Sequence, residues 1–354
     1  MNTKLLRRSS QAFLLASGLV LAACTTAPPE PQPVVTAPAP VQETMPPPPP
    51  PPLYIPARPV DERMGEPLIR AAGNHAVLMG HIHKTTNGSI NTPEHMNQTM
   101  DGLSQVFSPG IGPAFIGYGA LIGAQNSQFA EGVIETARYQ GLDTVVYQLY
   151  VDPDYAASLP GAELASGEIQ NAWASDVASI GRSAARMKEQ SYSLQKQSKW
   201  KKLRTDSRAE RLEAVSRAQS VRFNPPTETT RQIAQTGTIR EGDLDGPQKR
   251  QSFWQVFGHA SPPQTETFSN QYKRGMHRKA LTLSALEILG ATGSDSSEWI
   301  ENYMTSPRLT QCVNTARLNT EQCIAAGHFK YEDAFCIAEH ELKEISDCLA
   351  QSTL

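Results

Sequence analysis

Four cysteines near the C-terminus have the spacing that points most directly to a defined chemistry. They are Cys312, Cys323, Cys336 and Cys348. Between 10 and 12 residues separate each cysteine from the next. Zinc sites favour short C-x-x-C pairs, so this even set favours two disulfides, with a structural zinc site as the alternative.

Helix geometry removes one of the three ways to pair these cysteines. Residues 331–350 are predicted to form a helix because apolar residues recur every three or four positions. Along that helix Cys336 and Cys348 would lie about 18 Å apart, whereas a disulfide needs Cα atoms within about 7 Å. We favour the nested pairing of an antiparallel hairpin, Cys323 with Cys336 and Cys312 with Cys348. The crossed pairing is the alternative.

Three histidines form a weaker candidate site, for a metal ion. His81 and His83 would point to one side of an extended segment, and His95 follows nearby. Imidazoles in such an arrangement bind zinc or iron, which would suit a metal-dependent hydrolase. The chain has no G-x-S-x-G elbow and no phosphate-binding glycine-rich loop. We therefore predict a non-enzymatic protein without a cofactor, and keep the hydrolase as an alternative.

A basic stretch stands out from a chain whose net charge is only −3. Residues 182–222 hold 12 Lys or Arg and 4 Asp or Glu, a net charge of +8. The C-terminal residues 298–354 hold 9 acidic and 4 basic residues, so a solvated helix face partly neutralised by that segment is one interpretation. The other is a surface for an anionic partner. Its candidate residues are Lys196, Lys199, Lys201, Lys202, Arg204 and Arg208.

The first 23 residues have the pattern of an export signal. Lys4, Arg7 and Arg8 are positive, and an apolar run follows from residue 13 to residue 23. That run is shorter than the roughly 20 residues needed to cross a bilayer. We predict that residues 1–23 are removed, which makes disulfides reasonable in the mature protein.

The signal ends in Leu21-Ala22-Ala23-Cys24, which resembles the lipobox of bacterial lipoproteins. This resemblance implies cleavage before Cys24 and acylation of that cysteine, which makes the membrane anchor effectively permanent. In that class an acidic residue after the cysteine is associated with inner-membrane retention, and here the residue is Thr25. We therefore expect an outer-membrane anchor that faces the periplasm. The inner membrane and the cell surface are the alternatives.

A proline-rich tether is predicted to follow the anchor, over residues 24–59. Fifteen prolines lie between Thr25 and Pro59, seven of them consecutive. Such a sequence favours polyproline II, and at about 3.1 Å per residue it would reach roughly 110 Å. Solubilising disorder is the alternative interpretation.

The remaining 295 residues predict a mainly α body with a real hydrophobic core. We expect a helical domain over residues 60–222, a polar linker over 223–264, and a C-terminal helical region with two disulfides over 265–354. The first domain should contain a long amphipathic helical hairpin. Its first helix spans about 168–203, and a shorter basic helix follows.

Two shorter segments carry their own predictions. The uncharged residues 111–124 predict a buried helix. Residues 144–151 are β-branched and aromatic, so they suit either a strand or a buried helix.

These features together favour a non-enzymatic lipoprotein of the cell envelope that acts as a scaffold, tether or assembly factor. An exported protein meets no genomic nucleic acid, so the predicted partner is another envelope protein or a cell-wall polymer. A cell-wall polymer binding module that uses the basic helices is a further alternative, beside the envelope hydrolase.

Overall fold

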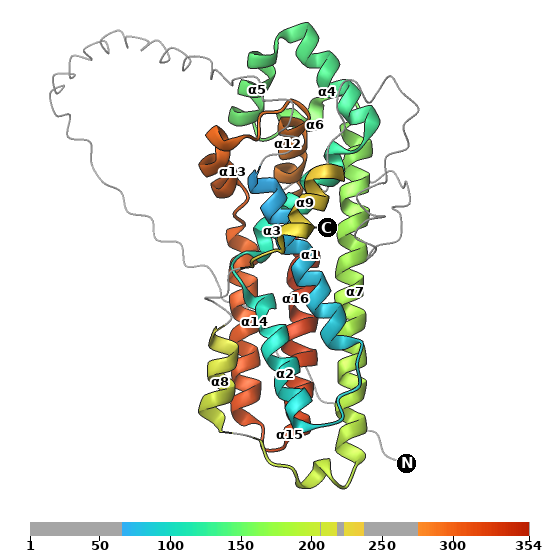
Figure 1. Cartoon of the computed structure of the whole chain (residues 1–354), viewed down its shortest axis with the longest axis vertical. Coiled ribbons are helices and arrows are strands. Elements are labelled where there is room, and N and C mark those ends of the chain that lie inside the picture. The colour runs from blue at the N-terminus through green and yellow to red at the C-terminus, as the bar shows by residue number, and fades with distance from the viewer. Residues whose placement is uncertain (1–65, 206, 218–222, 237–274, 354) are drawn as a thin grey trace, which may run out of the picture. The chain divides into compact units, whose positions relative to one another are not determined.

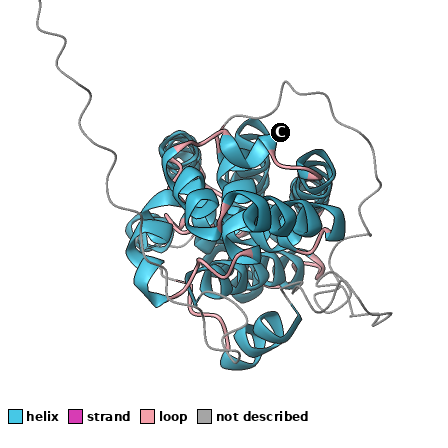
Figure 2. Ribbon diagram, turned by 90° about the horizontal axis from the view of Figure 1, so that it is seen from above, coloured by secondary structure: helices cyan, strands magenta, loops and turns pink. Residues whose placement is uncertain are grey.

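The computed structural model describes residues 66–205, 207–217, 223–236 and 275–353 (Figure 1). The predicted signal peptide, the lipobox and the proline-rich tether lie outside these residues. The described part of the chain consists of helices and their connections and contains no strand (Figure 2). The prediction of a mainly α body is therefore confirmed.

Seven helices precede the long one. They are α1 (Glu66–Thr86), α2 (Pro93–Leu103), the 3-10 helix η1 (Ser104–Phe107), α3 (Ile111–Ala124), α4 (Ser127–Gln140), α5 (Leu142–Val151) and α6 (Tyr155–Ser158). Helix α5 decides between the two alternatives for residues 144–151: Val145, Val146 and Leu149 are buried on one face of a helix. The polar step Asp152-Pro153 follows its end, where proline disfavours further helix.

Helix α3 forms the centre of the core, and the prediction that it is buried is confirmed. Every one of its residues except Pro113 is buried, and it packs against α12 (Met276–Ile288), α1 and α7 (Ala162–Lys196). Glycines permit these contacts, because a Cβ on Gly119 would come within 2.6 Å of the Trp173 ring.

No single helix in the described part of the chain is long and apolar enough to cross a membrane. One bent pair, residues 93–107 with 111–124, meets the length and composition test at an angle of 70°.

The long amphipathic helix is α7, which spans 35 residues. It begins six residues earlier than predicted, since Gly161 adopts a left-handed conformation (φ 80°) directly before it. The predicted apolar stripe is buried: Trp173, Val177, Ile180, Ala184, Met187 and Leu194. The 3-10 helix η2 (Trp200–Lys202) and the basic helix α8 (Arg208–Arg217) follow. Helix α8 makes its main contacts with α14 (Pro307–Ala326) and α2 (Figure 1).

The predicted polar linker is partly wrong. Residues 227–236 form helix α9 (Thr227–Thr236), which packs on α1 through the fully buried Ile233. A single fully buried apolar residue docks this short helix, so its polar composition resembled that of a loop. Residues 237–264 lie outside the described part of the chain.

The C-terminal helices complete the described part of the chain. They are α12, the 3-10 helix η5 (Ser294–Ser296), α13 (Ser297–Tyr303), α14, α15 (Lys330–Cys336), the π-helix η6 (Ile337–Lys343) and α16 (Glu344–Thr353). Helices α15, η6 and α16 run on from one another and pack between α14 and α7. Because α12 packs most extensively on α3, the two predicted helical regions share one hydrophobic core.

Two disulfides join α14 to this last helical run. Cys312 pairs with Cys348 and Cys323 with Cys336, and the Cα atoms of each pair lie 5.6 Å apart. The nested pairing is therefore confirmed. The two helical runs are antiparallel from the connection at residues 327–329, so the two cysteines nearer that connection meet, and so do the two farther from it.

Candidate functional site: a basic turn beside a disulfide

The six candidate cations lie on and around the connection between α7 and α8. Helix α7 ends where the Gln197 N–H bonds the Leu194 carbonyl, and η2 then buries the Trp200 side chain at 1% exposure. The next residues pair with the start of α15: the Thr205 N–H donates to His328 O at 3.2 Å, and the Lys330 N–H donates to Leu203 O at 3.0 Å. The backbone that carries these cations is therefore held at both ends. We call residues 196–208 the basic turn.

All six cations of the basic turn are exposed. No carboxylate in the described part of the chain lies within ion-pair distance of any of them. The guanidinium of Arg204 lies 4.5 Å from the centroid of the Phe329 ring, which orients it without neutralising it. Among the described residues, the basic turn thus presents positive charge without a neighbouring carboxylate.

Acidic residues of the C-terminal segment neutralise other cations of the basic stretch. Lys188 pairs with Glu339 at 2.6 Å, and Arg211 pairs with Asp333 at 2.7 Å. These two pairs agree with the interpretation that the acidic C-terminus neutralises part of the stretch, and they leave out the basic turn.

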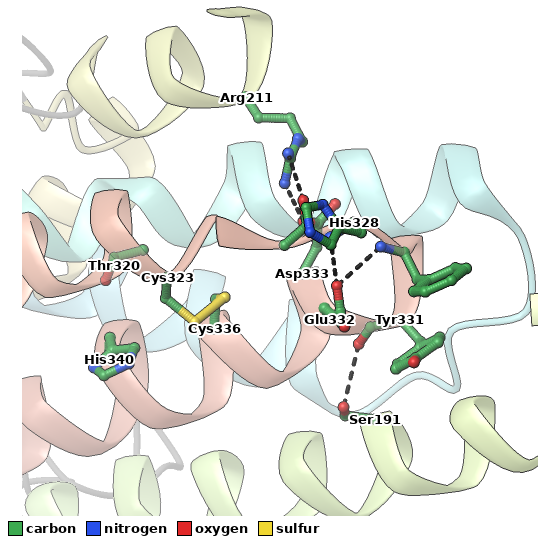
Figure 3. Close-up of a disulfide and its surroundings, with 12 residues drawn as sticks. Ser191, Arg211, Thr320, Cys323, His328, Tyr331, Glu332, Asp333, Cys336 and His340 are labelled. Carbon is green, nitrogen blue, oxygen red and sulfur yellow. Dashed lines mark hydrogen bonds and ion pairs between the residues drawn. A yellow bond between two sulfur atoms is a disulfide. The ribbon is translucent and has the colours of Figure 1, made fainter. Parts of the chain in front are cut away.

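A buried charge cluster ties α8 to α15 behind the basic turn. Arg211 Nη1 donates to Asp333 Oδ1 (Figure 3), Lys330 Nζ lies 3.1 Å from Asp333 Oδ2, and Lys330 also donates to Asn97. All three charged side chains are almost fully buried. Burial raises the pKa of Asp333, and the two positive charges offset part of that rise. This cluster was missed from the sequence, where the i,i+3 pair Lys330 and Asp333 is its only local signal.

The π-helix η6 contains a second buried acid, Glu341. Its side chain is fully buried, and neither carboxylate oxygen has a hydrogen-bond partner among the described residues. Burial and, to a smaller extent, the negative charge of Asp101 raise the pKa of Glu341 well above its usual range. π-helical segments occur often at functional sites. Four apolar residues of the predicted helix are buried despite this π-helical turn: Ala338, Leu342, Ile345 and Leu349.

Glu341→Gln should remove a pH dependence of stability. The folded chain holds the Glu341 proton more tightly than the unfolded chain, so the native protein should lose stability as pH rises from about 4.3 towards the raised folded pKa. Glutamine does not titrate, so we expect the variant to be more stable than the native chain at pH 7.5 and its stability to change less between pH 4 and pH 7.5. Urea unfolding at pH 4 and pH 7.5 measures this difference. The exposed Glu298→Gln is the control, and identical pH profiles for Glu341→Gln and the native chain would refute the prediction.

The three candidate metal ligands do not come together. His81 and His83 lie on helix α1, where two residues correspond to a rotation of about 200°, so they point to opposite sides. His95 lies on α2. The described residues contain no group of three or more His, Cys, Asp or Glu side chains that could hold a metal ion. The extended geometry on which the metal site depended is therefore wrong.

A different histidine is buried in the core. His75 Nε2 lies 3.0 Å from Asp176 Oδ2, and the imidazole stacks on the Tyr118 ring with 3.7 Å between the ring centroids. These side chains connect α1, α3 and α7. The contacts occupy the faces of the imidazole inside a packed core, so they stabilise the helix packing.

A groove lies beside the basic turn, between α7 and α15. It has a volume of about 310 Å³ and is lined by the Tyr192, Tyr331 and Phe335 side chains together with the Cys323–Cys336 disulfide. The backbone carbonyl of Tyr331 accepts a hydrogen bond from Ser191, which holds the two walls together (Figure 3). No local sequence pattern predicts this groove, because its walls come from helices that are far apart in the chain.

Comparison of the chain with protein-family models, with curated proteins and with solved structures found no match.

Proposed function

We propose that this protein is an outer-membrane-anchored lipoprotein that faces the periplasm and acts as a non-enzymatic tether or scaffold, holding an anionic partner of the cell envelope at its basic turn. The observation that carries this proposal is the set of six exposed cations that have no acidic partner among the described residues, on a backbone bonded to the start of α15. The N-terminal sequence supports the anchor, and the proline-rich segment supports a spacer between the anchor and the body.

The fixed backbone and the exposed cations of the basic turn favour a role in binding a partner over a role in solubility alone. Cations on a preorganised backbone lose little conformational freedom when a partner binds. Their attraction for an anion is strong at low ionic strength and falls as salt screens it. Residues 196–208 therefore combine the charge and the rigidity that an anion-binding surface needs.

Charge reversal tests this role of the basic turn. We expect Lys196→Glu, Lys199→Glu and Lys201→Glu together to weaken co-sedimentation of the full chain with isolated envelope material at least tenfold, because each reversal replaces attraction by repulsion. Binding by the native chain should weaken steeply between 50 and 300 mM salt, concentrations of the order at which screening becomes strong.

The matched control reverses three exposed cations elsewhere on the body, Lys84, Arg138 and Arg308. This variant has the same net charge as the basic-turn variant, so it separates a local site from the effect of overall charge. Equal losses in the two variants, or binding that does not respond to salt, would refute the proposal.

Cys24→Ser tests the anchor. Without the thiol the chain has no acceptor for acyl groups, so we expect complete loss of palmitate label from the protein in cells. Thr25→Asp is the matched variant: it should keep the label, and the resemblance to lipoproteins implies that it moves the protein to the inner membrane. Label retained on the Cys24→Ser chain would contradict the lipid anchor.

A further inference from the structure

We infer that the groove between α7 and α15 and the basic turn form one binding site for an acidic glycan, with sugar rings on the aromatic side chains and carboxylates or other anionic groups on the cations. This inference rests on the proposed function and names the chemical class of the partner.

The groove has the size and lining of a site for a ring-shaped unit. Its volume of about 310 Å³ is at the lower end of the range for ligand pockets, which suits one sugar unit of a longer polymer. Aromatic side chains form one part of the lining, and Gln195 and Ser191 supply polar groups beside them. A sugar ring needs both kinds of surface, because it has C–H faces and a rim of hydroxyl groups.

The aromatic side chains continue beyond the groove towards the basic turn. The Tyr192 and Phe335 rings lie 6.3 Å apart, and Tyr331 stacks on Phe329 at 5.7 Å with the ring planes only 9° apart. The electron-rich faces of such rings attract the slightly positive C–H groups of a sugar. These four rings therefore form an extended apolar surface.

Cations lie over two rings of this aromatic surface, and one of them, Lys188, is also paired with Glu339. Lys188 Nζ lies 5.5 Å from the Phe335 centroid, and Arg204 lies over Phe329, the ring on which Tyr331 stacks. Lys196 follows Tyr192 by one helical turn, so the two side chains lie on the same face of α7. The basic turn therefore adjoins the groove through Lys196, one helical turn after Tyr192, and through Arg204, whose ring partner Phe329 stacks on Tyr331.

One acidic residue, Glu332, lines the groove, and hydrogen bonds hold its carboxylate against the protein backbone. One carboxylate oxygen of Glu332 accepts the backbone N–H groups of His328 and Phe329, at 2.5 and 2.9 Å. These bonds satisfy the start of α15 (Figure 3) and hold the carboxylate against the backbone. Glu332 thus has a fixed position in the lining, and the positive charge that an anion would meet comes from the basic turn.

The same observations favour a glycan over an acidic peptide. The described part of the chain has no strand edge on which a peptide could add a strand. An acidic peptide without rings would use the cations alone and leave the four aromatic rings unused. Charge complementarity in turn favours a polymer with carboxylates over a neutral glycan.

The experiment measures binding of the full chain, in detergent micelles, to three polymers. Polygalacturonate carries sugar rings and carboxylates, polyglutamate carries carboxylates on a peptide backbone, and dextran is a neutral glycan. We expect Tyr192→Ala to weaken binding to polygalacturonate at least tenfold and to leave binding to polyglutamate within twofold of the native value. Tyr192 is 47% exposed, so its replacement leaves the core intact. Tyr139→Ala, at a tyrosine that is 91% exposed on α4, is the control.

The outcomes separate this inference from the proposed function. Equal affinity of the native chain and Tyr192→Ala for polygalacturonate would overturn the glycan site, and so would equal affinity of the native chain for polyglutamate and polygalacturonate. If the basic-turn charge reversals still abolish sedimentation with envelope material, the proposed function stands in either case. Failure of both measurements would overturn both.

Discussion

Asp333→Ala should lower the free energy of unfolding by about 3–5 kcal/mol, the largest effect of any single substitution considered for this protein. The carboxylate of Asp333 is fully buried between the cations of Arg211 and Lys330. Its removal leaves two positive charges in the interior without a counter-charge. Since typical domains are stable by only about 5–15 kcal/mol, the variant should unfold at a much lower urea concentration.

An exposed ion pair provides the control. Asp347 pairs with Lys343 at 2.6 Å, and both side chains are about half exposed. Water and salt screen that pair, so Asp347→Ala should cost at most about 1 kcal/mol. Urea unfolding at pH 7 compares the two variants. A loss of less than about 1 kcal/mol for Asp333→Ala would show that the buried cluster does not hold α8 against α15.

Removal of the disulfides should have the second-largest effect. Cys312→Ala with Cys348→Ala opens a link across 36 residues, and Cys323→Ala with Cys336→Ala opens one across 13 residues. The chain-entropy model gives losses of about 4 and about 3 kcal/mol, because the unfolded chain gains more freedom when a longer loop opens. Thermal unfolding of the two double variants under oxidising conditions measures both losses.

The two double variants also serve as controls for each other. The longer link should stabilise more than the shorter one, and addition of a reductant should destabilise the native chain but not a variant that lacks all four cysteines. Non-reducing peptide mapping identifies the linked peptides directly. A map that joins Cys312 to Cys336 would contradict the nested pairing.

The Cys323–Cys336 disulfide has a further consequence, because it lines the groove proposed to bind a glycan. Its removal should therefore weaken glycan binding as well as stability. The Cys312–Cys348 disulfide is not among the groove residues. Comparison of the two double variants separates the effect on the groove from the effect on stability.

The sequence predicted best where local regularity is strong. Residues 111–124 are apolar on all sides, which only a buried position can accommodate, and the rise of a helix alone excluded one disulfide pairing. Prediction was less successful where the local pattern fitted two structures, or where the structure depends on contacts with distant segments. Residues 144–151 suited two structures, and α9 depends on a single buried side chain, Ile233.

At the candidate site, too, local sequence patterns did not predict contacts between distant residues. In an extended segment His81 and His83 would point to the same side, whereas in helix α1 they point to opposite sides. The partners Arg211 and Asp333 lie 122 positions apart, and the π-helical turn around Glu341 has no simple sequence pattern. Such contacts depend on side chains from distant segments, which periodicity does not reveal.

The sequence by itself determined the helical class, the four paired cysteines and the excess of positive charge between residues 182 and 222. It also carries the predictions of a lipid anchor and a proline-rich spacer. Only the tertiary structure decided which cations remain without partners. Net charge counts every acid alike, whereas an ion pair forms only where packing brings two groups within about 4 Å. In the folded chain Glu339 pairs with Lys188 and Asp333 pairs with Arg211. The cations of the basic turn have no such partner among the described residues.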